Sequence, residues 1–198
     1  MKELEIVVAT NNNHKLNEYK NIFSAYPNVI LKSLNDEKID IDPEENGKTF
    51  KENSLIKAKA IANFTNKIVL ADDSGLEIRA LDGFPGIYSS RFMHDKPYIE
   101  KCQAIFDMLK DKPREAQFHC VITLLNLVKE PLQFEGIATG VIDTKITGTH
   151  GFGYDPIFIC DANNKSFASL SEEEKNKVSH RALATASLLK YLKDNNYI

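Results

Sequence analysis

The chain opens with a short apolar, β-branched run that passes at once into a polar turn and a helical pattern. Residues 4–9 (Leu-Glu-Ile-Val-Val-Ala) have the composition of a buried strand. Residues 10–13 (Thr-Asn-Asn-Asn) suit a turn and a helix N-cap. The apolar residues that follow recur at helical spacing: Leu16, Tyr19, Ile22 and Phe23. A strand–turn–helix unit of this kind is typical of α/β folds, in which helices cover the faces of a sheet.

The same interleaving continues along the chain. Further strands are expected at 29–34, 67–71, 117–128 and 134–142, the last two as an antiparallel pair. The strand at 67–71 is expected to end in a glycine turn at 72–75, and residues 76–81 extend again. Helices are expected from residue 50 onward, at 98–109, and as one closing helix over about 177–193. The pattern predicts a mixed-sheet α/β fold.

Length and composition narrow the function classes. At 198 residues the chain fits a single domain, residues 1–198, with a substantial core. The net charge of −3 argues against a large nucleic-acid footprint. No apolar run approaches the ~20 residues that a membrane-crossing helix needs, and no signal peptide is evident. Three scattered cysteines indicate buried thiols in a reducing compartment, so we expect a cytoplasmic protein.

The first polar turn is a candidate phosphate site. Residues 10–15 place polar side chains and a lysine at a helix N-terminus: Thr10, Asn11, Asn12, Asn13, His14 and Lys15. Backbone N–H groups at a helix start can receive phosphate oxygens, and Lys15 can neutralise their charge. The alternative is a simple helix cap with a solvated lysine.

Acidic residues in the first half are candidate metal ligands. Asp72 and Asp73 follow a buried strand, so one carboxylate can point toward a site while strand alternation sends the other elsewhere. Such a carboxylate can bind Mg²⁺ or activate water. Glu44 and Glu45 add acids before a helix start, although Glu in that place also serves as an ordinary cap. Asn53 and Lys57 are spaced i, i+4 and share one helix face.

The second half carries a glycine-dense segment over residues 148–156. Its glycines permit close backbone approach to a ligand, and Phe152 or Tyr154 could stack on a planar base. Lys175 and the run Ser179-His180-Arg181 add hydrogen-bond donors near the closing helix. The alternatives are a hairpin-like loop and a solvated helix face.

Several familiar catalytic patterns are absent from the sequence. It contains no P-loop, no Gly-x-Gly-x-x-Gly fingerprint, no Gly-x-Ser-x-Gly elbow and no zinc spacing among its histidines. The residues alone therefore indicate a phosphate-binding α/β protein with an acidic metal site.

Read in order, these segments resemble the inosine triphosphate pyrophosphatase family, which acts on non-standard purine nucleotides. The matching stretches are 9–15, 50–54 with 57–58, 70–76, 83–91 (Gly-Phe-Pro-Gly-Ile-Tyr-Ser-Ser-Arg), 118–120, 151–158 (Gly-Phe-Gly-Tyr-Asp-Pro-Ile-Phe) and 179–181. Each motif is weak alone, but their joint order covers nearly the whole chain.

The resemblance implies a fold, a site and an assembly. The fold would be an elongated, twisted mixed β-sheet flanked by helices, with two lobes around a nucleotide-binding cleft, and the protein would be a homodimer. Thr10 to Lys15 would hold the phosphates, Asp73 would be the catalytic carboxylate, and Asp73 with Glu44 would bind Mg²⁺; whether Glu44 or Glu45 is the ligand stays open. The remaining implied substrate contacts are Asn53, Lys57, Ser74, Arg91, Phe152, Gly153, Tyr154, Asp155, Lys175, His180 and Arg181.

The implied activity is Mg²⁺-dependent hydrolysis of purine nucleoside triphosphates (ITP, dITP, XTP) to the monophosphate and pyrophosphate, which cleanses the nucleotide pool. Water would attack the α-phosphorus, with Asp73 orienting it and Lys15 helping to hold the charge of the leaving group. Two alternatives remain at this point: a pyrophosphatase of the septum-inhibitor type that acts on pyrimidine or modified nucleotides, and a nucleotide-binding sensor without catalysis.

Overall fold

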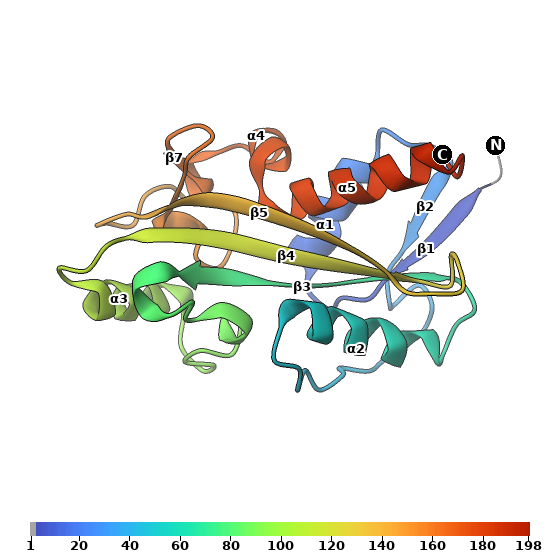
Figure 1. Ribbon diagram of the computed structural model, residues 1–198, viewed down its shortest axis with the longest axis horizontal. Helices are drawn as coiled ribbons and strands as arrows, with labels where there is room; N and C mark the ends of the chain where they lie inside the picture. The colour runs from blue at the N-terminus through green and yellow to red at the C-terminus, as the bar shows by residue number, and fades with distance from the viewer. Residues whose placement is uncertain (1–2) are drawn as a thin grey trace. The chain divides into compact units, whose positions relative to one another are not determined.

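The computed structural model describes residues 3–198, which form a mixed α/β fold (Figure 1). Within this range the strands are β1 (Leu4–Val8), β2 (Val29–Lys32), β3 (Ile68–Ile78), β4 (Glu115–Leu125), β5 (Leu132–Ile142), β6 (Phe158–Cys160) and β7 (Lys165–Ser166). The α-helices are α1 (Asn13–Phe23), α2 (Phe50–Ala62), α3 (Tyr98–Leu109), α4 (Glu172–Val178) and α5 (His180–Asp194). The predicted mixed-sheet α/β class is confirmed.

The strands form one seven-stranded sheet in the order β2-β1-β3-β4-β5-β6-β7. β1 runs parallel to both β2 and β3, with Val7 opposite Lys32 on one side and Val69 on the other. β6 is antiparallel to β5 and to β7. The parallel part comes from the strand–turn–helix opening, because a helical crossover returns the chain in the same direction.

The chain divides into two compact units, each with its own core. The first unit contains the chain up to Asp73 together with Cys120–Gly136 and Ala184–Ile198. The second contains Ser74–His119 and Ile137–Leu183. Strands β3, β4 and β5 and helix α5 contribute residues to both units.

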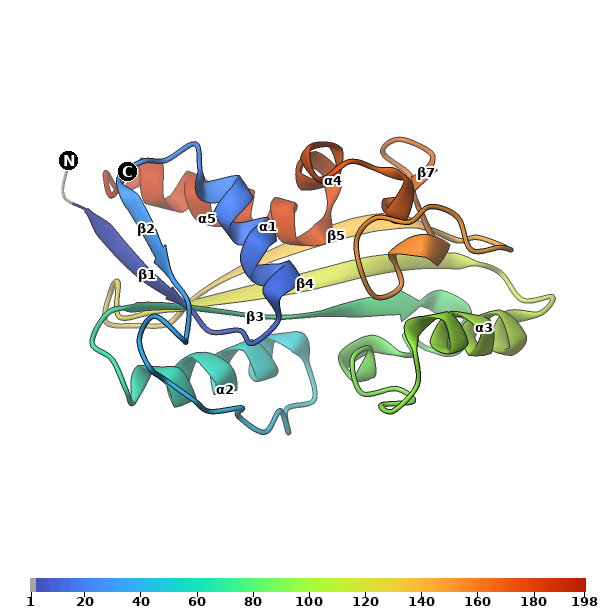
Figure 2. The ribbon, with the colours of Figure 1, turned by 180° about the vertical axis from the view of Figure 1, so that it is seen from behind.

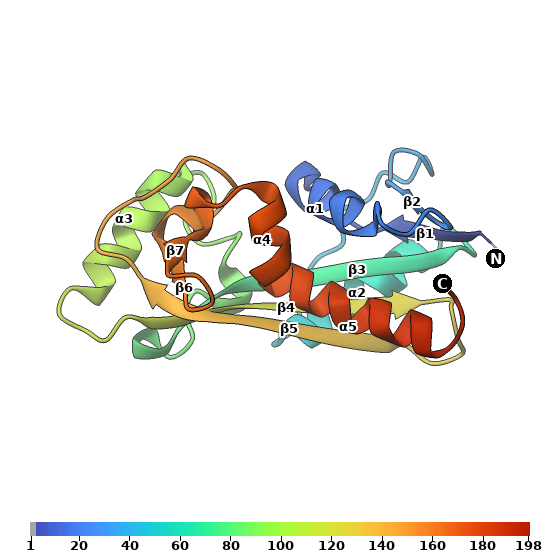
Figure 3. The ribbon, with the colours of Figure 1, turned by 90° about the horizontal axis from the view of Figure 1, so that it is seen from above.

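The first unit has helices on both faces of its strands. Along β1, Ile6 and Val8 pack with apolar residues of α1 and α5, while Val7 packs with Ala58 and Ile61 of α2. The period-two alternation of a strand produces this division. Figure 1 shows α2 on one face, and Figure 2 and Figure 3 show α1 and α5 together on the other.

Side-chain caps fix where α1 and α2 begin. The Asn12 side chain accepts hydrogen bonds from the backbone N–H groups of His14 and Lys15 at the start of α1. Thr49 accepts from the N–H of Glu52 at the start of α2. Caps of this kind satisfy donors that have no partner within the helix.

The second unit packs its core against one face of its strands. Leu76, Phe118 and Ala138 belong to a cluster that includes Ile105 of α3 and Phe167. Residues on the opposite face of the same strands, such as Glu77, Gln117 and Thr139, instead line a cavity that is described below. Aromatic rings add contacts within the core, with the Phe118 and Phe158 ring centroids 4.9 Å apart.

Two sequence predictions of secondary structure are wrong. β3 does not end at Ala71 but continues to Ile78 through the expected turn at 72–75. The acidic pair is tolerated inside the strand because the side chains of both aspartates form hydrogen bonds. The single closing helix is two helices, because Ser179 adopts an extended backbone after α4 and its hydroxyl accepts the N–H of Ala182 in α5.

The three cysteines agree with the prediction that was made from the composition. Cys102, Cys120 and Cys160 are buried and free, which confirms the prediction of buried thiols. Burial raises the pKa of the Cys102 thiol to about 11. Among residues 3–198 no helix is both long enough and apolar enough to cross a membrane.

Candidate functional site

Strand alternation sends the two aspartates of β3 to opposite faces of the first unit. Asp72 lies on the same face of β3 as Leu70, and Leu70 packs with α1 and α5. Asp73 lies on the same face of β3 as Val69 and Ala71, and these two residues pack with α2. Both carboxylates are buried, at 2% and 6% exposure. Each therefore needs polar partners on its own face.

Asp72 is paired with the lysine of the first turn. Lys15 Nζ lies 2.9 Å from Asp72 Oδ2, and Cys120 Sγ lies 3.8 Å from the same oxygen. Lys15 belongs to the first turn of α1, where Thr10 Oγ1 also accepts the N–H of Asn12. The predicted phosphate segment is thus a capped helix start whose lysine is held at a fixed position by Asp72.

Asp73 faces the first two turns of α2. Asn53 Nδ2 donates to Asp73 Oδ2 at 3.0 Å, and Lys57 Nζ lies 3.8 Å from Asp73 Oδ1. Lys57 also pairs with Glu45 Oε1 at 2.7 Å. The i, i+4 spacing predicted to put Asn53 and Lys57 on one helix face does so, and both reach the same carboxylate.

The electrostatics of this cluster favour a bound cation. Burial raises the pKa of the Asp73 carboxyl above its usual range; Lys57 opposes the shift, Glu45 adds to it, and Lys15 and the Asn53 hydrogen bond oppose it. Burial alone would lower the pKa of Lys57, but Asp73, Asp72 and Glu45 raise it above its ordinary value. Lys57 therefore stays charged beside the carboxylates of Asp73 and Glu45.

The donor set fits a magnesium ion that is shared with substrate. In the part of the chain that the structure describes, no group of three or more His, Cys, Asp or Glu side chains is arranged to hold a metal. Mg²⁺ in nucleotide enzymes is commonly bound by one or two carboxylates together with phosphate oxygens and water. Asp73 and Glu45, two hard oxygen donors that interact electrostatically with each other, match that pattern.

The two candidate glutamates differ in their surroundings. Glu44 is exposed. The side chain of Glu45 is 19% exposed, pairs with Lys57 and interacts electrostatically with Asp73. Of the two alternatives left open by the sequence, Glu45 is the one beside the Asp73 carboxylate.

In the second unit, Asp155 organises the glycine-dense segment. Its Oδ2 accepts the N–H of Phe152 at 2.8 Å and lies 2.6 Å from Lys175 Nζ, in a pair whose side chains are 3% and 6% exposed. Lys175 Nζ sits 4.8 Å from the centre of the Phe152 ring. Gly151 has φ +73, and a Cβ there would clash with Asp155 Oδ2, so a side chain would break this arrangement.

Arg181 and His180 form a second buried group in this unit. Arg181, 1% exposed, donates from Nη2 to Ser74 Oγ at 2.9 Å. The His180 ring stacks on Phe118, with centroids 4.7 Å apart and planes inclined by 12°. The start of α5 is therefore held by packing and hydrogen bonding, so its donors have fixed directions.

Tyr154 and Arg91 have structural partners. Tyr154 is 2% exposed, belongs to the core of the second unit and donates its hydroxyl to the Ser89 carbonyl. Phe152 is only partly buried, so of the two aromatics it is the one placed to stack on a base. Arg91 Nη2 donates to the Ile87 carbonyl, and its guanidinium lies 5.5 Å from the centre of the Tyr88 ring.

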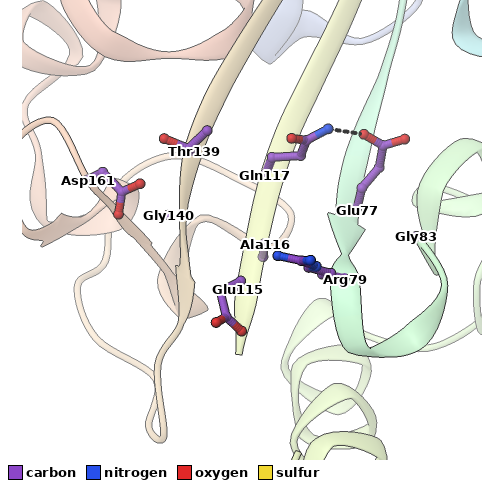
Figure 4. A pocket seen from close by; sticks show the side chains of 9 residues that line it. All are labelled: Glu77, Arg79, Gly83, Glu115, Ala116, Gln117, Thr139, Gly140 and Asp161. Atoms are coloured by element: carbon purple, nitrogen blue, oxygen red, sulfur yellow. Dashed lines mark hydrogen bonds between the residues drawn. The ribbon is translucent and has the colours of Figure 1, made fainter. Parts of the chain in front are cut away.

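A separate cavity of about 500 Å³ lies on the other face of the strands of the second unit (Figure 4). Its lining residues are Glu77, Arg79, Gly83, Glu115, Ala116, Gln117, Thr139, Gly140 and Asp161. Gln117 Nε2 donates to Glu77 Oε2 at 2.7 Å (Figure 4). This lining contains three carboxylates and none of the residues that the sequence singled out.

The comparison with known proteins bears on the two clusters built on Asp73 and Asp155. A model of the Ham1 family matches residues 6–191. The chain belongs to the Ham1 family. The matched range contains every candidate residue named above.

Relatives of this Ham1 family chain match it over nearly their full length. It is 41% identical to a dITP/XTP pyrophosphatase from Staphylococcus epidermidis, over 98% of this chain and 99% of the relative. It is 46% identical to a dITP/XTP pyrophosphatase from Halalkalibacterium halodurans, over 95% and 98%. Its fold matches a HAM1 protein from Coxiella burnetii with a TM-score of 0.87, 38% identity and coverage of 96% and 99%.

Within each unit of this Ham1 family chain, the structure brings most predicted residues together. Asn53, Lys57 and Asp73 meet in the first unit, as do Phe152, Asp155 and Lys175 in the second. Sequence reasoning missed the pairing of Lys15 with Asp72 and the stacking of Phe118 on His180. The alternation of β3 was the available signal for the first; nothing in the sequence signalled the second.

Proposed function

We propose that this Ham1 family chain hydrolyses non-standard purine nucleoside triphosphates, dITP, ITP and XTP, to the monophosphate and pyrophosphate with the help of Mg²⁺. The observation that carries the proposal is the buried Asp73 carboxylate held by Asn53 and Lys57 beside Glu45. Full-length relatives named dITP/XTP pyrophosphatase support the choice of substrate.

Cationic groups of the first unit bind the triphosphate in this proposal. Lys15 and the N–H groups at the start of α1 hold phosphate oxygens, as helix N-termini commonly do. Asp72 keeps Lys15 in one rotamer through their 2.9 Å contact, which lowers the entropy cost of binding. Lys57 supplies a second fixed positive charge next to Asp73. Asn11, Asn13 and His14 lie around the same helix start.

Asp73 and Glu45 hold the metal in the proposed complex. Mg²⁺ supplies charge neutralisation on the triphosphate and lowers the pKa of a bound water. The chain's own contribution is to keep both carboxylates correctly directed, which Asn53 and Lys57 do through their contacts with Asp73 and Glu45.

The chemical step is an in-line displacement at the α-phosphorus. Asp73 accepts a proton from the attacking water while a new P–O bond forms to the nucleotide. The bond from the α-phosphorus to the bridging oxygen breaks, and pyrophosphate leaves with the electron pair. Lys15 and the α1 N–H groups stabilise the charge that develops on the leaving group.

Residues of the second unit recognise the base. The Phe152 ring stacks on the purine, and Arg181, His180 and Lys175 supply donors toward the oxygen at C6. Ser74 orients Arg181, Asp155 orients Lys175, and Gly153, Tyr154 and Arg91 support the surrounding loops.

The remaining parts of the proposal concern the whole protein. Residues 1–198 act as one functional pyrophosphatase domain, the protein is a homodimer, and it works on the nucleotide pool of the cytoplasm. The family resemblance supports these three statements.

Incubation of the purified protein with XTP and Mg²⁺ tests the proposed reaction. We expect xanthosine monophosphate and pyrophosphate in equal amounts, because each attack at the α-phosphorus releases one molecule of each. Chromatography and a pyrophosphate-specific assay give the products. Release of orthophosphate and a diphosphate would contradict attack at the α-phosphorus, and turnover of pyrimidine triphosphates alone would favour the other pyrophosphatase class.

Removal of divalent ions should lower turnover of XTP at least ~10-fold, because two carboxylates would otherwise face the triphosphate without a counter-charge. The measurement is the rate after dialysis against a chelator, followed by return of Mg²⁺. Restored activity is expected with Mg²⁺, the ion suited to hard oxygen donors. An undiminished rate in the chelated sample would exclude a metal at Asp73 and Glu45.

Paired glutamate variants decide which acid serves the metal. Glu45→Gln should raise the Mg²⁺ concentration needed for half-maximal rate by roughly 10-fold, the scale for losing one ligand or its support. Glu44→Gln is the matched control and should leave it unchanged, because Glu44 is exposed. The opposite result would return the role to Glu44, the residue named from the sequence.

A further inference from the structure

A hydrogen-bond network with two buried hydroxyl groups joins α2 to strands β4 and β5 within the first unit. Ser54 of α2 and Thr123 of β4 are both 0% exposed, and their hydroxyl oxygens lie 2.7 Å apart. Gln133 of β5 donates from Nε2 to Thr123 Oγ1 at 2.9 Å. The same nitrogen donates to the Lys51 carbonyl of α2, also at 2.9 Å. Three elements are thus tied together by side chains in one small region.

One assignment of hydrogens gives every donor in the network a partner. The Ser54 hydroxyl donates to the Lys51 carbonyl at 3.1 Å, so the Thr123 hydroxyl donates to Ser54 Oγ. The two hydrogens of Gln133 Nε2 serve Thr123 and Lys51. A buried network with all donors partnered permits one arrangement and resists sliding of its elements. Ser54 therefore fixes the position of α2 along the sheet.

The anchored part of α2 is the part that carries the proposed active-site groups. Asn53 precedes Ser54 directly, and Lys57 follows one turn later. A helix turn is rigid, so the anchor at Ser54 also sets the 3.0 Å contact of Asn53 with Asp73 and the 3.8 Å contact of Lys57. A displacement of about 1 Å at such a site can cost a large part of the rate.

We propose that Ser54, Thr123 and Gln133 are positioning residues for the pyrophosphatase reaction, which act through α2 to hold Asn53 and Lys57 at Asp73. This inference rests on the proposed function of Asp73. The three residues supply no group to the substrate; their role is to keep the helix in the one register that directs the carboxylate.

The test is Thr123→Val in the full-length protein, a nearly isosteric change that removes the shared hydroxyl. We expect kcat for XTP to fall roughly 10-fold, because the Asp73 cluster loosens. KM should stay within about threefold, since the Lys15 region lies on α1 and keeps its contacts. Thr123→Ser, which restores the hydroxyl, should recover kcat to within about twofold of the parent.

The matched control is Thr185→Val, which makes the same change at a threonine of α5 that is also 0% exposed in the first unit. It removes a buried hydroxyl of α5, whose apolar residues pack on the opposite face of β1 from those of α2, so its kcat should equal that of the parent. An equal loss in Thr185→Val and Thr123→Val would reduce the effect to general destabilisation and overturn the positioning role.

Combination with Asn53→Ala separates positioning from a loss of stability. If Thr123 acts through Asn53, Thr123→Val should add little further loss of kcat in the Asn53→Ala background. Fully additive losses would overturn the proposal.

Hydrogen exchange of the α2 amides, which needs no activity, should be faster in Thr123→Val than in the parent. A parent without pyrophosphatase activity overturns the proposed function, whereas an active parent with unchanged kcat in Thr123→Val overturns only the positioning role.

Discussion

Replacement of Asp73 with asparagine should lower kcat for XTP roughly 10²-fold or more, the combined scale of a general base and part of a metal site. The change keeps the shape of the side chain but removes the charge that binds Mg²⁺ and accepts a proton from water. Lys57 would keep its other partner, Glu45, so the local ion pairs do not collapse. Steady-state kinetics at saturating Mg²⁺ measure the effect.

Asp161→Asn is the matched control for this prediction. Asp161 is an exposed aspartate that lines the cavity of Figure 4, outside the proposed site, and its replacement should leave kcat unchanged. The thermal unfolding midpoints of both variants show whether the fold is intact. A kcat within about tenfold of the parent for folded Asp73→Asn would refute the catalytic assignment of Asp73.

The second large effect concerns the choice of base. We expect kcat/KM for ITP and XTP to exceed that for ATP by ~10³-fold or more, because donors directed at a C6 oxygen would be left buried and unpaired against the amino group of adenine. The margin over GTP should be smaller, since guanine shares the oxygen and differs in its 2-amino group. Both ribose and deoxyribose substrates should be accepted. Competition among triphosphates, read as relative kcat/KM, measures the ratios.

Arg181→Ala should shrink the ratio of kcat/KM between ITP and ATP, because the buried guanidinium is a principal candidate donor to the base. Arg181 is fully buried and bonded to Ser74, so the truncation also costs stability, and the ratio rather than the absolute rate is diagnostic. Arg79→Ala, at an exposed arginine of the same unit, is the control and should keep the ratio. If ATP and ITP values fall together in Arg181→Ala, Arg181 supports binding without reading the base.

Local patterns in the sequence predicted much of the fold. The opening unit and the helix at 98–109 follow from periodicity and capping, and α3 spans those residues. The course of β3 could not be predicted, because an acidic pair and a glycine normally end a strand. Its continuation depends on partners far away in the sequence, Lys15 for Asp72 and Asn53 for Asp73. Tertiary contacts overrode the local turn signal.

The candidate site divides in the same way. Residue types with a chemical signature, such as Asp73, Lys57 and Lys175, could be named from the sequence. The choice between Glu44 and Glu45 could not, because it depends on which side chain the loop turns toward Lys57. Thr123 and Gln133 could not be named from the sequence, because they look like ordinary strand residues. Only their contacts in the structure distinguish them.

On the ribosome, the first unit cannot complete its core until Ala184–Ile198 has been made. Ile6 and Val8 of β1 pack in one cluster with Leu188 and Leu192 of α5. The core of the first unit therefore needs apolar residues that are far apart in the sequence. At ~5–20 residues per second, roughly 10–40 s pass between the synthesis of β1 and that of α5. During that time the newly made strand has α1 but lacks α5, the second helix that covers the same face. The yield of this protein in a cell should therefore depend on protection of the nascent chain as much as on the stability of the finished fold.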